Sequence, residues 1–204
     1  MNKNASTPHI ESKPRGRPRS PEIEAAILTA TTELLATKSL REVTADAIAQ
    51  RAGVSKATLY KWWPNKNLVA LDAFLSIMRQ NVDIPNTGSA FRDFKLELQS
   101  VLRFYVGPQG RLFREFIAEG QSDPEFLELF RRRFLASRHD DVRIIWERGV
   151  RRGEIRSDVD PDIGMDMIFG PLIARMLYGR GPLDDTSAEA VVALVFGGIQ
   201  KAAA

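Results

Sequence analysis

Apolar residues recur at every third or fourth position through most of this chain, which is the spacing of an amphipathic α-helix. The first run follows Ser20 and Pro21, a capping residue with proline at the first helical position, and predicts a helix over residues 21–37. Three more helices are expected soon after it, each opened by a residue that caps a helix N-terminus: Thr44, Ser55 and Asn65. No strand-like alternation accompanies them. The pattern predicts an all-α fold.

The helical spacing continues from Gly88 towards the C-terminus, with a break at Gly107 and Pro108. Further helix starts carry a capping box or a helical proline, at Ser122 with Glu125, at Asp160 with Pro161, and at Thr186 with Glu189. We therefore expect about nine helices, arranged as an N-terminal three-helix head and a larger C-terminal domain. The expected divisions are a flexible basic arm over residues 1–19, a helix-turn-helix domain over 20–66, a connecting helix over 67–87 and a C-terminal domain over 88–204.

Positive charge is concentrated at one end of the chain. The formal net charge is only +3, but residues 1–66 hold 11 Lys and Arg against 6 Asp and Glu, whereas the remaining residues hold 18 against 20. A basic module on a nearly neutral body suits a head that binds a polyanion. A solvated basic surface would give the same distribution, so charge alone leaves both interpretations open.

Residues 44–62, which read TADAIAQRAGVSKATLYKW, predict a helix-turn-helix. The small side chain of Ala49 allows two helices to cross closely, and Gly53 tolerates the left-handed backbone of the turn. Val54 and Leu59 would fill the space between the helices. The alternative is an ordinary antiparallel helix pair. In a helix-turn-helix, the outer face of the second helix would enter a DNA major groove about 12 Å wide.

Residues 21–82 resemble the DNA-binding domain of the TetR family of one-component transcriptional regulators. The resemblance rests on the paired Leu34 and Leu35, on residues 53–60 (GVSKATLY), and on Lys66. Together with the exposed face of the second helix, it implies a set of DNA-contacting residues: Thr44, Ser55, Lys56, Ala57, Thr58, Tyr60, Lys61 and Lys66.

Thr44 and Lys66 are expected at helix N-termini, where backbone N–H groups and a hydroxyl or ammonium can hold phosphate oxygens. The chain departs from the family at Lys61-Trp62-Trp63, where members often have aromatic and histidine combinations ending in Phe. This departure leaves the base preference open. Trp63 is interpreted as core packing beneath the second helix of the motif.

The arm carries a second signal, KPRGRPR, which resembles the core of an A·T hook. Arg15, Arg17 and Arg19 would reach along a narrow minor groove while the intervening glycine lets the backbone lie flat on its floor. Homeodomain arms occupy a comparable position beside the major-groove helix. A solvated basic tail is the alternative.

The C-terminal domain carries no motif of comparable specificity. TetR-family members bury small effectors among their middle helices, and by resemblance four aromatic residues are candidates to line such a cavity: Phe104, Phe116, Phe134 and Trp146. Aromatic residues at helical spacing also form ordinary cores. The last two helices are expected to form a four-helix bundle with a second subunit, through Ile168, Leu172, Met176, Val191, Val195, Phe196 and Ile199. The alternative is that these residues are internal.

Other classes of function are disfavoured. The chain has no cysteine, His9 lies in the arm, His139 stands alone, and no nucleophile with a base, metal-ligand spacing or phosphate loop is visible. We expect no enzyme activity, cofactor or metal. No apolar run reaches the length of about 18 residues that a membrane span needs, and no secretory signal is visible, so a cytoplasmic protein is expected.

The expected function is that of a homodimer that binds a near-palindromic DNA operator and releases it when a small-molecule effector binds. Repression and release follow from the resemblance alone. The alternative function is a weakly specific architectural protein that uses the arm as its main DNA contact.

Overall fold

The computed structural model describes residues 20–199, and this part of the chain is built from helices, with no strand. The elements are α1 (Pro21–Thr37), α2 (Ala45–Arg51), α3 (Lys56–Trp62), α4 (Lys66–Asn81), α5 (Ala90–Val106), α6 (Pro108–Ser122), α7 (Pro124–Phe130), the π-helical η1 (Arg131–Leu135), α8 (Ala136–Arg151), α9 (Pro161–Tyr178) and α10 (Asp185–Ile199). Because α7, η1 and α8 continue without a break, the described residues form nine helical runs, as predicted. Within residues 20–199, no helix is long and apolar enough to cross a bilayer.

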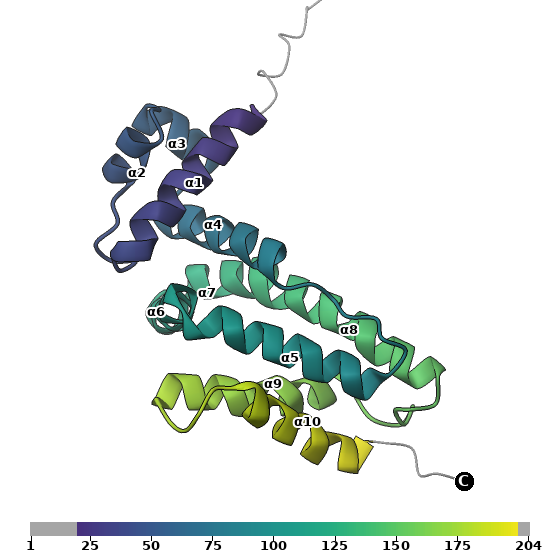
Figure 1. Cartoon of the computed structure of the whole chain (residues 1–204). Helices are drawn as coiled ribbons and strands as arrows, with labels where there is room; N and C mark the ends of the chain where they lie inside the picture. Colours follow the sequence, from purple (N-terminus) through teal and green to yellow (C-terminus); the bar gives the residue numbers. More distant parts are fainter. Residues whose placement is uncertain (1–19, 200–204) are drawn as a thin grey trace, which may run out of the picture.

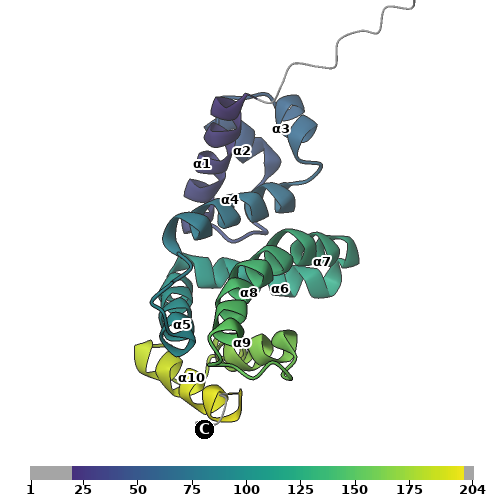
Figure 2. The same ribbon diagram turned by 90° about the vertical axis from the view of Figure 1, so that its right-hand side faces the viewer.

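The first three helices form a head at one end of the molecule, and α4 connects the head to a larger helical body (Figure 1). The view turned by 90° shows α5, α6 and α8 on the side of α4 away from the head, with α9 and α10 furthest from it (Figure 2). Within the body, α10 packs against α5, and α1 packs against α4 at the junction. The head is therefore carried on α4 and projects from the body.

Buried apolar side chains form two clusters. One contains Leu59 of the head, Phe74 of α4, and Phe113 and Phe116 of α6. The rings of Phe74 and Phe116 meet edge to face, with their centroids 5.6 Å apart. The other cluster lies between α5, α8, α9 and α10. The head thus shares a continuous core with the adjoining part of the body.

Most of the predicted helix starts are confirmed. Thr44, Ser55 and Asn65 cap α2, α3 and α4, and each side chain accepts a hydrogen bond from the backbone N–H three residues on, at 2.9 to 3.1 Å. Ser20 precedes α1 as predicted, although its hydroxyl bonds the Glu22 carboxylate instead of a backbone N–H.

Two predicted caps are wrong by one or two residues. Asp123, and not Ser122, caps α7, because its carboxylate lies directly before the helical proline and accepts two backbone N–H groups at 3.0 and 3.1 Å. At α10, Asp184 replaces Thr186 as the cap and exchanges hydrogen bonds with Ser187. In both places a nearby aspartate outcompetes a hydroxyl residue.

The π-helical turn η1 joins α7 to α8 within one continuous helical run. Phe130, directly before this turn, and Phe134, within it, both face the interior and stack with centroids 5.1 Å apart and planes 18° apart. Arg133 lies on the outside of the same turn. Such turns insert one residue into an α-helix and are frequent at functional positions.

The corner between α5 and α6 depends on one glycine. A Cβ atom on Gly110 would overlap the carbonyl oxygen of Tyr105 and lie 2.8 Å from its carbonyl carbon. Because that obstacle is backbone, it cannot move aside as a side chain can. Gly110 therefore sets how closely α6 approaches the end of α5.

Candidate nucleic-acid interface and internal cavity

The helix-turn-helix forms as its sequence predicts. Gly53 has a φ of +67°, the left-handed conformation that the turn requires, and the Val54 N–H donates to the Ala49 carbonyl at 3.0 Å. Ala49 and Leu59 are buried where α2 and α3 meet. The second helix of the motif is thus anchored from inside by Leu59.

The opposite face of α3 is open to solvent. Four of its predicted DNA-contacting residues are exposed: Lys56, Ala57, Tyr60 and Lys61. Tyr60 has 46% of its surface exposed, which is unusual for a large aromatic residue unless it serves a contact. Thr58 is partly exposed and Ser55 is exposed at the cap. No described part of the chain covers this face.

Lys56 is held in place by an acidic residue of the preceding helix. Its Nζ atom lies 2.9 Å from Oδ1 of Asp46 and 6.0 Å from the centre of the Tyr60 ring. The hydrogen bond and charge of Asp46 raise the pKa of Lys56 above the usual lysine value, so the side chain is a cation. Asp46 also offsets part of the positive charge that this face presents to a phosphate.

Lys66 is bonded within the head. Its ammonium donates to the carbonyl oxygens of Leu40, Arg41 and Val43 at 2.8, 3.1 and 2.7 Å. These bonds use all three N–H donors of the group. Lys66 therefore braces the loop before α2, and its predicted phosphate contact stays a prediction.

The described head carries little net charge. Residues 20–66 contain six Lys and Arg against five Asp and Glu, whereas residues 1–19 contain five against one. Arg15, Arg17 and Arg19 lie outside the described residues. Most of the positive excess noted at this end of the sequence thus belongs to the arm.

A side-chain link at the end of α3 was missed from the sequence. Trp63 is buried, as predicted, and its indole Nε1–H donates to Oδ2 of Asp72 at 2.7 Å. The same carboxylate accepts from Arg133 of η1 through both of its oxygens, at 2.7 and 2.8 Å. The sequence gives only a weak signal for this link: a buried indole N–H needs a hydrogen-bond acceptor, but the sequence does not say which residue supplies it.

Family models match both parts of the chain. Residues 27–71 match the model described as bacterial regulatory proteins of the tetR family. Residues 84–195 match a tetracyclin repressor-like C-terminal domain.

Full-length relatives agree with these matches. The chain is 37% identical over 195 residues to the uncharacterized HTH-type transcriptional regulator YdeS of Bacillus subtilis (strain 168), which covers 96% of this chain and 98% of YdeS. The chain belongs to the TetR family of transcriptional regulators.

Solved structures of the family share the architecture. The TetR-family regulator SCO0332 has a TM-score of 0.80 and 31% identity, covering 87% of this chain and 98% of that one. FadR from Bacillus subtilis, solved in complex with stearoyl-CoA, has a TM-score of 0.67 at 21% identity, covering 86% and 98% of the two chains, which supports the fold alone. All three relatives are named as transcriptional regulators.

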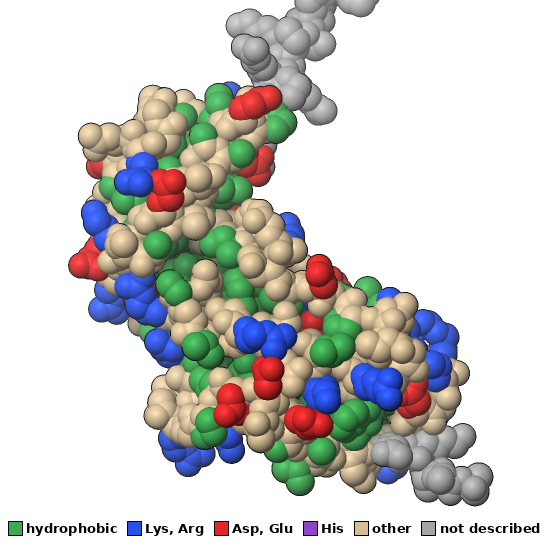
Figure 3. Space-filling model, viewed as in Figure 1, with side chains coloured by type: hydrophobic (Ala, Val, Ile, Leu, Met, Phe, Trp, Pro, Cys, Tyr) green, Lys and Arg blue, Asp and Glu red, His purple; other side chains and the backbone are tan. Residues whose placement is uncertain are grey.

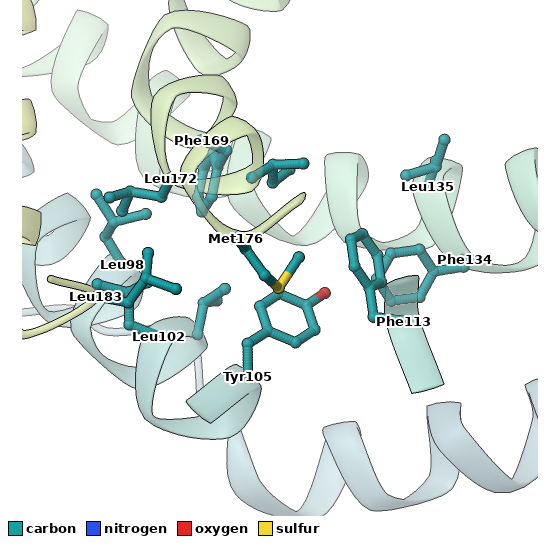
Figure 4. Close-up of a pocket in the computed structure, with 12 residues that line it drawn as sticks. Leu98, Leu102, Tyr105, Phe113, Phe134, Leu135, Phe169, Leu172, Met176 and Leu183 are labelled. Atoms are coloured by element: carbon teal, nitrogen blue, oxygen red, sulfur yellow. The ribbon is translucent and has the colours of Figure 1, made fainter. Parts of the chain in front are cut away.

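The body of this TetR-family regulator contains an apolar cavity of about 90 Å³ between α5, α6, η1, α9 and the loop before α10 (Figure 4). Its lining residues are Leu98, Val101, Leu102, Tyr105, Phe113, Phe134, Leu135, Phe169, Leu172, Ile173, Met176 and Leu183. The Tyr105 hydroxyl is the polar side-chain atom of this lining and is directed into the space between Met176 and Phe113 (Figure 4). Burial raises the pKa of Tyr105, so the hydroxyl keeps its proton.

Of the four aromatic residues expected to line a cavity, Phe134 does so. Phe104 and Phe116 pack their rings on Phe74 in the core shared with the head. Trp146 lies in the other cluster, where its ring occupies the space that a Cβ on Gly164 would need. Helical spacing identified buried aromatic residues correctly but could not separate close-packed positions from the cavity wall.

The residues predicted for the dimer interface mostly face inward. Ile168, Leu172, Met176, Phe196 and Ile199 are buried within the chain, and Val191 and Val195 are partly buried.

A different set of α9 and α10 residues is exposed and apolar. It comprises Ile163, Met167, Pro171, Leu177, Tyr178 and Leu194. In Figure 3, apolar side chains are visible along the lower edge of the molecule, where these helices lie. Both helices are apolar on more than one face, and five of the seven residues predicted for the interface are buried within the chain.

Proposed function

We propose that this regulator is a homodimeric repressor that binds a near-palindromic operator through α3 and releases it when a small apolar effector enters the cavity. The exposed, internally anchored face of α3 is the observation that supports DNA reading most directly. Leu59 fixes the helix from below while Lys56, Tyr60 and Lys61 extend from its outer face. This is the arrangement by which a recognition helix enters the major groove.

Replacing Lys56 and Lys61 together by alanine is expected to weaken binding to an operator selected from random DNA by at least about tenfold. If both lysines bind phosphates, the slope of log affinity against log salt should fall by about 0.9 for each phosphate that is no longer neutralised. Asp46→Asn should act in the opposite direction, because it removes a negative charge beside the phosphates and releases Lys56. Fluorescence anisotropy over a salt series measures both variants against the wild-type protein.

Lys95→Ala, on α5 in the body, is the matched lysine control and should leave DNA affinity unchanged. Wild-type affinity in the double variant would contradict the proposal.

Deleting residues 1–19 tests the architectural alternative, which the positive charge of the arm favours. A regulator would keep its sequence preference at lower affinity, whereas an architectural protein would lose nearly all binding. In the proposed regulator, Arg15, Arg17 and Arg19 contribute minor-groove contacts beside α3.

The exposed apolar face of α9 and α10 is the proposed subunit contact. A two-fold operator is matched by a two-fold protein, whose recognition helices lie about 34 to 36 Å apart. Met167, Tyr178 and Leu194 are 56%, 75% and 80% exposed, respectively, which leaves large apolar side chains in water unless a partner covers them. A four-helix bundle between two copies would bury them.

Leu194→Glu is expected to yield monomers of 22.9 kDa where the wild-type protein yields dimers, because a charge would enter the bundle. Val106→Glu, at an exposed apolar residue of α5 that is not part of the proposed contact set, should leave the dimer intact. Light scattering after size-exclusion chromatography measures the mass. A dimeric Leu194→Glu protein would exclude this surface as the contact.

The cavity lining specifies the class of effector. Its walls are aliphatic and aromatic, and Tyr105 supplies the one hydroxyl of this lining. A neutral, largely apolar molecule with one hydrogen-bonding group would match this lining. An ionised group placed among these side chains would lose its hydration without a partner.

A further inference from the structure

We propose that Asp72 couples the cavity to the DNA-reading helix, because the same carboxylate holds Trp63 at the end of α3 and Arg133 of η1, the turn whose next two residues line the cavity. This inference rests on the proposed effector cavity and adds the route by which its occupation reaches α3. Asp72, Trp63 and Arg133 act as positioning residues, since none of them is on the exposed face of α3.

The link is direct on the side of the recognition helix. Trp63 follows α3 immediately, and its backbone N–H donates to the Leu59 carbonyl at 3.0 Å, which closes the last turn of the helix. Its buried indole N–H is fixed on Asp72 at 2.7 Å. A displacement of the Asp72 carboxylate must therefore either move Trp63 or leave a buried donor without its acceptor, which is costly.

The link is equally direct on the side of the cavity. Arg133 binds both oxygens of Asp72, and the next two residues along η1, Phe134 and Leu135, line the cavity. Phe134 also packs against Phe74 of α4, with ring centroids 5.6 Å apart. One π-helical turn thus presents a cation to α4 on its outside and a wall to the cavity on its inside.

The size of the cavity makes movement of this wall necessary. An engineered cavity that binds benzene has a volume of about 150 Å³, and the cavity here has a volume of about 90 Å³. A larger occupant must therefore displace part of the lining. Leu135 is 41% exposed, so η1 can move towards solvent. Helices α5 and α9 cannot move outward as easily, because α10 packs against both of them. Outward movement of η1 carries Arg133 away from its position on Asp72.

The test compares Arg133→Gln with Arg132→Gln, its neighbour, which pairs with Glu128 on the preceding turn and not with α4. The probe is the neutral fluorescent dye N-phenyl-α-naphthylamine. Binding of the dye, its effect on operator affinity, and the indole N–H resonance of Trp63 are measured for each protein. The Trp63 signal is assigned with Trp62→Phe and Trp146→Phe.

In the wild-type protein and in Arg132→Gln, the dye should weaken operator binding and shift the Trp63 resonance. In Arg133→Gln, the dye should bind with nearly unchanged affinity, but its effect on operator binding should fall by about tenfold. Asp72→Asn keeps an acceptor for the indole and removes the charge that holds Arg133, so it should behave like Arg133→Gln. Equal coupling in Arg132→Gln and Arg133→Gln overturns the inference.

A second arm separates failure of the coupling from failure of the proposed effector site. Ile173→Phe fills the cavity from within, and Ile144→Phe places the same substitution on an exposed position of α8. If the dye does not bind the wild-type protein, the effector proposal loses its support. The coupling is then decided by Ile173→Phe. This substitution must shift the Trp63 resonance, whereas Ile144→Phe must not. The shift must be smaller when Arg133→Gln is combined with Ile173→Phe. An unchanged resonance overturns the inference.

Discussion

Alanine at position 110 is expected to destabilise the protein by about 3 kcal/mol or more, at the upper end of the range for overpacked positions. The new methyl group would overlap the carbonyl oxygen of Tyr105, so α6 would have to move away from the end of α5. Tyr105 and Phe113, one on each side of this corner, both line the cavity. Urea unfolding followed by circular dichroism measures the loss of stability.

Gly120→Ala provides the control within the same helix. A Cβ at Gly120 would lie 3.1 Å from the Cδ1 atom of Leu127, the flexible end of a side chain, so the substitution should change stability by less than about 1 kcal/mol. Comparable losses in the two variants would show that general crowding of α6, and not the approach to the Tyr105 carbonyl, determines the cost.

Arg138→Ala is expected to destabilise the protein by about 3 kcal/mol, because it leaves the Glu97 carboxylate buried without a cation. Glu97 is fully buried and is bonded to Arg138, and its Oε2 atom has no partner among the described residues. Arg143→Ala, which removes a partly exposed arginine from the same helix, should change stability by less than about 1 kcal/mol. Unfolding free energies of the two variants decide the comparison.

The same variant should show a distinct pH dependence. Burial raises the pKa of Glu97 and Arg138 opposes this effect, so removing Arg138 raises the pKa further. A raised carboxyl pKa means that the folded state binds the proton more tightly than the unfolded state. Stability then falls as pH rises from the ordinary glutamate range to the raised value. The cost of Arg138→Ala should therefore be smaller under mildly acidic conditions than at neutral pH, and a cost independent of pH would contradict this account.

Local signals in the sequence were sufficient for the head. The caps at Thr44, Ser55 and Asn65, the turn at Gly53 and the burial of Leu59 each follow from short-range chemistry, and the structure confirms them. The bracing role of Lys66 could not be predicted, because its three acceptors are carbonyls of a loop more than 20 residues earlier. Such acceptors leave no mark in the side-chain pattern.

The body was less predictable because its last helices are apolar on more than one face. Periodicity identifies apolar stripes on α9, but it does not say whether Leu172 or Met167 faces the interior; the structure buries the first and exposes the second. The link between Asp72 and Arg133 joins residues separated by 61 positions, and nothing in the side-chain pattern pairs these two residues with each other. Tertiary packing determines both features.

The aromatic core beneath α4 has a consequence for the engineering of chimeric regulators. Phe74 packs on Phe104, Phe113 and Phe116, all of which follow the segment that joins α4 to α5. A hybrid joined within that segment would place the α4 of another protein on this ring cluster. A head cut out at the same segment would expose to solvent the apolar face of α4 that the rings cover. Transplanting the DNA specificity of this protein therefore requires grafting the outer residues of α3 alone, or moving α4 together with the rings on which it rests.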